Sequence, residues 1–170
     1  SGNEPGIGVD DDDEIDLDID INDHNYQWGL DRIDQEFLPL DKKRYDPVFD
    51  GDGISIYVID TGIVATHEQF EGRAKKGRDI YNKDSDPLDG NGHGTHVSST
   101  IIGKDVGVAP GAEVFGVKAL SDAGFGFTSD VIKGIEWSVK HSKLNNKCSI
   151  ISMSLGSGFS SILNKVANSA

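Results

Sequence analysis

The sequence predicts an α/β domain with a mostly parallel sheet. Apolar runs at residues 54–60, 113–120 and 148–155 have the length and composition of buried strands. Helical patterns lie between or after these runs, and strands that alternate with helices favour parallel pairing through right-handed crossovers. A chain of 170 residues is long enough to bury one such core.

Acidic residues are concentrated at the start of the chain. Residues 1–24 contain ten Asp or Glu and no Lys or Arg, so only −3 of the formal net charge of −13 belongs to the remainder. The like-charged run at residues 10–14 favours a solvated linker, although residues 15–21 alternate with the period of a strand. We therefore expect an acidic linker over 1–24 and a folded domain over 25–170.

A short arm follows, over residues 28–45, and it carries four oxygen-bearing side chains. Calcium takes six to eight oxygen ligands, with backbone and water completing the shell. The arm therefore predicts a calcium site at Asp31, Asp34, Gln35 and Asp41. The alternative is an exposed polar turn in which Asp31 or Asp34 caps a helix.

The first predicted strand ends on a carboxylate. In YVIDTGI, residues 57–63, the apolar run stops at Asp60 and Gly62 breaks it. Open α/β sheets place ligands and chemistry at the carboxyl ends of their strands. Taken alone, Asp60 is also explained as a turn-forming residue.

The stretch DGNGHGTHV, residues 89–97, predicts a glycine-rich turn that enters a buried helix with His93 at its start. A His there can face Asp60 across one crevice, and an Asp that fixes the tautomer of a His supports a general base. We expect His96 to pack or hydrogen-bond inside the protein. The acidic loop before this turn, residues 83–89, is expected at the surface, where it offers a second, weaker cation site.

One alternative class of protein remains for these two histidines. The spacing His93-x-x-His96 also suits a metal-dependent hydrolase, but that class needs further ligands, and no H-E-x-x-H motif or cysteine cluster occurs.

Thr128 or Ser129 is expected to cap a helix with an apolar stripe, and residues 160–170 have a helical pattern. The single cysteine, Cys148, cannot form an internal disulfide.

YVIDTGI and DGNGHGTHV resemble the Asp and His blocks of the subtilisin-like serine proteases, and WGLDRIDQ, residues 28–35, looks most like the proteinase K branch. The resemblance implies a three-layer α/β/α fold, incomplete at its C-terminus, and an Asp-His-Ser triad in that chain order. Asp60 would orient His93, and His93 would activate the serine. No GTSMA-type block occurs within residues 1–170, so we expect the serine and the oxyanion asparagine to lie outside them and the chain alone to be inactive.

The same resemblance implies where a substrate binds. The stretch Gly124, Phe125 and Gly126 matches a strand edge that pairs with an extended peptide; a flexible loop is the alternative. A second stretch matches one wall of the main specificity pocket, with a serine in place of a glycine: Ser154, Leu155, Gly156, Ser157 and Gly158. A catalytically dead protein that binds peptides through these two stretches is the alternative to a protease.

The resemblance also implies partners and location. Similar enzymes hold a calcium ion at positions that match the arm, carry an inhibitory N-terminal propeptide and are commonly secreted. We expect protein or peptide substrates, a propeptide junction near residues 1–24, no cofactor for catalysis beyond structural calcium, and no nucleic-acid partner. No apolar run is long enough to span a membrane, so no membrane association is expected.

Overall fold

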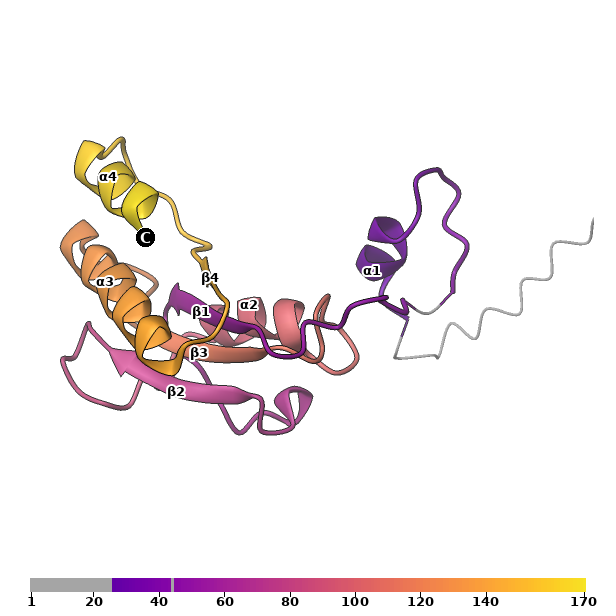
Figure 1. Cartoon of the computed structure of the whole chain (residues 1–170), viewed down its shortest axis with the longest axis horizontal. Coiled ribbons are helices and arrows are strands. Elements are labelled where there is room, and N and C mark those ends of the chain that lie inside the picture. The colour runs from indigo at the N-terminus through magenta and orange to yellow at the C-terminus, as the bar shows by residue number, and fades with distance from the viewer. Residues whose placement is uncertain (1–25, 44) are drawn as a thin grey trace, which may run out of the picture.

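The computed structural model describes residues 26–43 and 45–170, so the predicted acidic linker lies outside the described part. Helices and strands alternate along the chain (Figure 1), and their bounds are as follows: α1 (Trp28–Ile33), β1 (Ser55–Asp60), the 3-10 turn η1 (Glu68–Phe70), β2 (Ala74–Asp79), α2 (His93–Ile102), β3 (Glu113–Lys118), α3 (Thr128–Asn145), β4 (Ser149–Ser152) and α4 (Ser161–Ser169).

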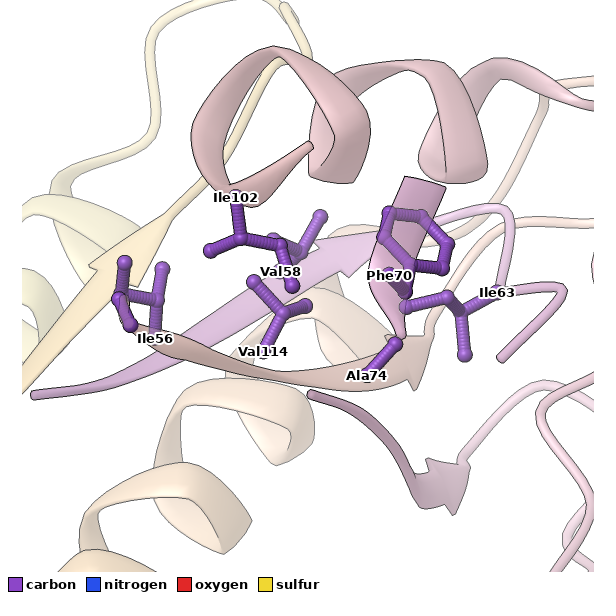
Figure 2. Close-up of a cluster of buried hydrophobic side chains, with 8 residues drawn as sticks. Ile56, Val58, Ile63, Phe70, Ala74, Ile102 and Val114 are labelled. Carbon is purple, nitrogen blue, oxygen red and sulfur yellow. The ribbon is translucent and has the colours of Figure 1, made fainter. Parts of the chain in front are cut away.

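The strands form one parallel sheet in the order β2-β3-β1-β4. Every residue of β1 is buried, as expected for a central strand of a parallel sheet that is covered on both faces. In β1, Ile56 and Val58 point toward α2, where they pack with Ile102 of that helix and Val114 of the neighbouring strand β3 (Figure 2). The intervening residues Tyr57 and Ile59 point to the other face, which α3 and α4 cover. The predicted three-layer α/β/α fold is therefore confirmed.

Several boundaries differ from the prediction. Strand β3 ends at Lys118 rather than at residue 120, because the backbone N–H groups of Ala119 and Leu120 turn to the carbonyl of Asp60. The stretch predicted as a buried strand over 148–155 gives only β4, which starts with two exposed residues. Within the described part of the chain β4 pairs with one neighbour, β1, which leaves its outer side open.

The helices keep their predicted apolar stripe but not their predicted caps. In α3, Val131 and Ile135 are buried and Val139 is half-buried. The N-cap of α3 is Phe127, which has no side-chain oxygen, so capping by Thr128 or Ser129 is wrong. In the arm, Asp31 lies inside α1 and Asp34 is its C-cap, so neither caps the N-terminus of that helix. None of the helices described is long and apolar enough to cross a membrane.

Candidate active site

Asp60 and His93 meet at the carboxyl edge of the sheet. Asp60 is the last residue of β1 and is fully buried, whereas His93 is the first residue of α2 and its side chain is 49% exposed. The imidazole Nδ1 and the carboxylate Oδ1 are 2.7 Å apart. Since a carboxylate only accepts hydrogen bonds, this contact keeps the proton on Nδ1 and leaves the lone pair of Nε2 for another partner.

The Asp60 carboxylate is itself held by the backbone. Thr61 N donates to Asp60 Oδ1 at 2.7 Å, so this oxygen accepts hydrogen bonds from both the backbone and the imidazole. The other oxygen, Oδ2, is buried and has no hydrogen-bond partner among the residues described. A carboxylate so enclosed has little freedom to rotate, which fixes the plane of the imidazole.

Asp89 ties the turn after β1 to the start of α2. Its carboxylate accepts from Thr61 Oγ1 (2.8 Å) in the turn after Asp60, and from Gly92 N (2.8 Å), Thr95 N (2.9 Å) and Thr95 Oγ1 (2.6 Å) at the start of α2. Burial alone would raise the pKa of Asp89, but the bonds from Thr95, Gly92 and Thr61 outweigh it and lower the pKa to about 2. The N-terminus of a helix also favours an anion.

The loop over residues 83–89 is mostly exposed, as expected, but Asp89 itself is buried, with 7% of it exposed, so the expectation is wrong for this residue. The other two carboxylates of that loop have partners among the described residues. Asp86 pairs with Lys76, and Asp84 Oδ1 accepts the backbone N–H of Asp86. The sequence feature that could have identified this role of Asp89 is its place before a glycine-rich helix start, with a threonine six residues later.

Two glycines let α2 approach the turn after Asp60. A Cβ atom on Gly94 would lie 2.3 Å from the carbonyl oxygen of Gly62, and one on Gly62 would lie 2.5 Å from the carbonyl oxygen of Pro87. Gly62 also has a φ of +125°, which side chains rarely adopt. These contacts leave no room for larger residues, so the glycines of the two sequence blocks set the distance between Asp60 and His93.

His96 is exposed, so the expectation that it packs inside is wrong. Three residues along α2, its side chain leaves the helix on a face that points away from the core. Within residues 26–43 and 45–170, no three His, Cys, Asp or Glu side chains are grouped to hold a metal. The His93-x-x-His96 spacing therefore has no third ligand of these types in the described part.

A cleft of about 360 Å³ opens beside His93. Seven of the eight predicted substrate residues line it; Gly158 does not. Those that line it are Gly124, Phe125, Gly126, Ser154, Leu155, Gly156 and Ser157. The sequence analysis did not single out Leu120, Asn91 or Leu163 for this site, because nothing in their local pattern distinguishes them from core or turn residues.

The segment predicted as a strand edge is not a strand in the structure. A turn at residues 122–123 precedes it, and residues 125–127 have no assigned secondary structure. Phe125 and Phe127 are 78% and 71% exposed, beside the cleft. Because the segment is not part of a sheet, it can pair with a peptide backbone only if other contacts hold it in place.

Of the four predicted calcium ligands, three lie around one turn and Asp34 does not; the three are Asp31, Gln35 and Asp41. Asp31 is buried, and its Oδ1 has no hydrogen-bond partner among the described residues, while Oδ2 accepts from Tyr26 Oη and from Lys42 N. Its hydrogen bond raises the pKa of Tyr26 to about 12. Hydrogen bonds from Lys43, backbone and side chain, lower the pKa of the Asp41 carboxyl.

Gln35 binds back to the same turn. Its amide nitrogen donates to the carbonyls of Phe37 and Pro39, and its oxygen accepts from Asp41 N at 3.0 Å. Asp34 is exposed at the end of α1. A buried carboxylate oxygen without a donor among the described residues, beside the Asp41 carboxylate, fits an oxygen-liganded cation.

The chain belongs to the subtilase family, whose model matches residues 51–170. It is 46% identical over 149 residues to alkaline serine exoprotease A of Vibrio alginolyticus, covering 88% of this chain and 27% of that protein. It is also 45% identical over 145 residues to subtilisin-like protease 1 of Trichophyton rubrum, covering 84% of this chain and 28% of that protein. The predicted resemblance is confirmed, and fungal relatives of this kind fit the proteinase K branch.

Solved structures agree with this assignment. A cold adapted subtilisin-like serine proteinase superimposes with a TM-score of 0.79 at 46% identity, covering 85% of this chain and 52% of that chain. Sphericase superimposes with a TM-score of 0.72 at 30% identity, covering 86% and 49%. The chain thus spans about a quarter of the length of the curated relatives above and about half of the solved ones.

Proposed function

We propose that this chain supplies the Asp-His half of the catalytic site of a serine endopeptidase, with the nucleophilic serine outside residues 1–170. The observation that carries the proposal is the 2.7 Å contact between His93 Nδ1 and the buried Asp60 carboxylate, beside an open cleft. Membership of the subtilase family supports it. An orienting carboxylate, a His with a free Nε2 and room for a substrate are what general-base catalysis requires.

In the proposed reaction, His93 Nε2 removes the hydroxyl proton of the serine while the serine oxygen bonds to the peptide carbonyl carbon. The resulting imidazolium is stabilised by the Asp60 carboxylate, which stays ionised. His93 then gives the proton to the leaving amine as the C–N bond breaks. A water molecule hydrolyses the acyl-enzyme by the same two proton transfers. An asparagine outside this chain would donate to the oxyanion.

The substrates would be proteins or peptides. The stretch Gly124, Phe125 and Gly126 would accept one side of an extended peptide backbone, and the exposed aromatic rings beside it would contact apolar side chains. The residues 154–157 would form the opposite wall. Since no serine of this chain stands in a nucleophile motif, we expect no turnover from residues 1–170 alone.

We further propose a structural calcium ion in the arm, held by the Asp31 and Asp41 carboxylates and by oxygens of the turn around Gln35; Asp34, exposed at the end of α1, is left out of this ligand set. The support is the unpartnered Oδ1 of Asp31 beside a second carboxylate. The ion would stabilise the arm and take no part in the chemistry. An inhibitory propeptide before residue 25 and secretion complete the proposal; a relative named an exoprotease supports secretion.

Labelling with a fluorophosphonate probe tests the proposal in the protein expressed from its complete reading frame. Such a probe reacts with an activated serine, so we expect one labelled serine, located by mass spectrometry outside residues 1–170. The His93→Ala variant should lose the label, because the hydroxyl is then no longer activated. The matched control is His96→Ala, which removes an exposed histidine of the same helix. Labelling that survives His93→Ala would contradict the proposal.

A further inference from the structure

The last residue of β3 is a buried lysine that the catalytic pair does not use. Lys118 is 2% exposed and lies in register with Asp60 on the neighbouring strand. A buried ammonium is costly unless its protons are bonded. Here Nζ donates to the carbonyl oxygen of Thr61 (2.5 Å) and to Asp122 Oδ1 (2.6 Å). Lys118 thus joins the turn after Asp60 to the loop that follows β3.

Asp122 extends this connection to the loop that precedes His93. Asn91 Nδ2 donates to the backbone carbonyl of Asp122 at 2.6 Å. The Asp122 carboxylate also packs on Gly90 so closely that a Cβ there would lie 2.4 Å from Oδ2. The hydrogen bond from Lys118, followed by its charge and a bond from the Gly90 backbone, lowers the pKa of Asp122. The carboxylate is therefore ionised at neutral pH.

The residues after Asp122 form one wall of the cleft. A tight turn begins beside it: Ser121 N donates to Phe125 O (2.8 Å), and Gly124 N donates to Ser121 O (2.9 Å). Gly124 takes a φ of +82° within this turn. Because Asn91 and His93 line the same cleft, the position of Asp122 sets where the glycine-rich segment lies relative to them.

We propose that Lys118 and Asp122 are a positioning pair that holds the segment of residues 124–126 against the loop before His93 and thereby sets the affinity for peptide. The inference rests on the proposed function, because it names what aligns that site for its substrate. No hydrogen bond in the described part joins either residue to the imidazole of His93 or the carboxylate of Asp60. Loosening the pair should therefore weaken peptide binding and leave proton transfer intact.

Steady-state kinetics of the protein from its complete reading frame tests this split. With a short peptide substrate, Asp122→Ala should raise KM about tenfold, the loss of one charge-assisted hydrogen bond, while kcat stays within about twofold. Asp122→Asn keeps an acceptor oxygen and should recover most of the affinity. Asp86→Ala is the matched control, since it removes an Asp paired with Lys76 on another loop. A fall in kcat at unchanged KM, or the same KM change in the control, would overturn the proposal.

Hydrogen exchange on the same complete protein provides a readout that does not depend on catalysis. Asp122→Ala should speed exchange of the amides of Ser121, Gly124 and Phe125, and Asp86→Ala should not. Unchanged exchange in Asp122→Ala overturns the positioning role. If exchange changes but the unaltered protein cleaves no peptide, the pair is supported and the proposed protease function is the part that fails.

Discussion

Replacing Asp89 by Asn removes the charge that ties the turn after Asp60 to the start of α2. The pKa of Asp89 is about 2 in the folded chain, against an ordinary value of 3.8. A difference of nearly two pH units corresponds to about 2 kcal/mol of folding free energy. Asn keeps one acceptor oxygen, but its NH₂ group would face donors, because each carboxylate oxygen of Asp89 accepts more than one hydrogen bond.

The folding free energy lost in Asp89→Asn should depend on pH with a definite sign. Because folding lowers the pKa of Asp89, the unfolded chain binds the proton first as the pH falls. The contribution is complete above about pH 5, falls to about half at pH 3 and is lost as the pH passes below about 2. Asn does not titrate, so the difference between the two proteins should follow this curve.

Urea denaturation followed by tryptophan fluorescence measures the difference at pH 7 and at pH 3. The control is Asp86→Asn, which changes an exposed ion pair and should cost at most about 0.5 kcal/mol. A cost at pH 7 below about 0.5 kcal/mol for Asp89→Asn would refute the reasoning. A cost that is the same at both pH values would show that the charge of Asp89 is not what holds the two segments.

Three further predictions concern packing and the arm. Gly94→Ala should destabilise the chain by about 2–4 kcal/mol in denaturation experiments, since its Cβ meets the Gly62 carbonyl, whereas Gly29→Ala in α1 has free space and should not. Ile135→Ala should cost about 2–5 kcal/mol, because the side chain is 1% exposed, and an unchanged midpoint would contradict the described core. Calcium should raise the melting temperature, and Asp31→Asn should abolish that rise; a rise that persists would place the ion elsewhere.

The elements that set the fold could be predicted because their signals are local. The run that ends at Asp60 is mostly apolar and β-branched, which is typical of a central parallel strand, and the structure buries every residue of β1. The glycines around His93 likewise predicted the start of α2. The contact between Asp60 and His93 followed once both residues were placed at the same edge of the sheet.

What the sequence did not predict depends on contacts between distant segments. The donors that bury Asp89 come from Thr61 and from α2, so its acidic neighbours suggested a surface loop instead. The exposure of β4 depends on which strand lies beside it, which no local pattern states. Likewise, Lys118 reads as an ordinary strand residue until the carbonyl of Thr61 and the carboxylate of Asp122 are found around its ammonium group.

The most direct test of the central claim is the turnover of a peptide substrate by the His93→Ala and His96→Ala variants of the protein from its complete reading frame. In subtilisin, removing the corresponding base alone lowers kcat by about 2 × 10⁶, and we predict a loss of that order for His93→Ala. His96→Ala should stay within about threefold, because its side chain is exposed and outside the cleft. Retention of a tenth or more of the activity in His93→Ala would contradict the assignment of His93 as the general base.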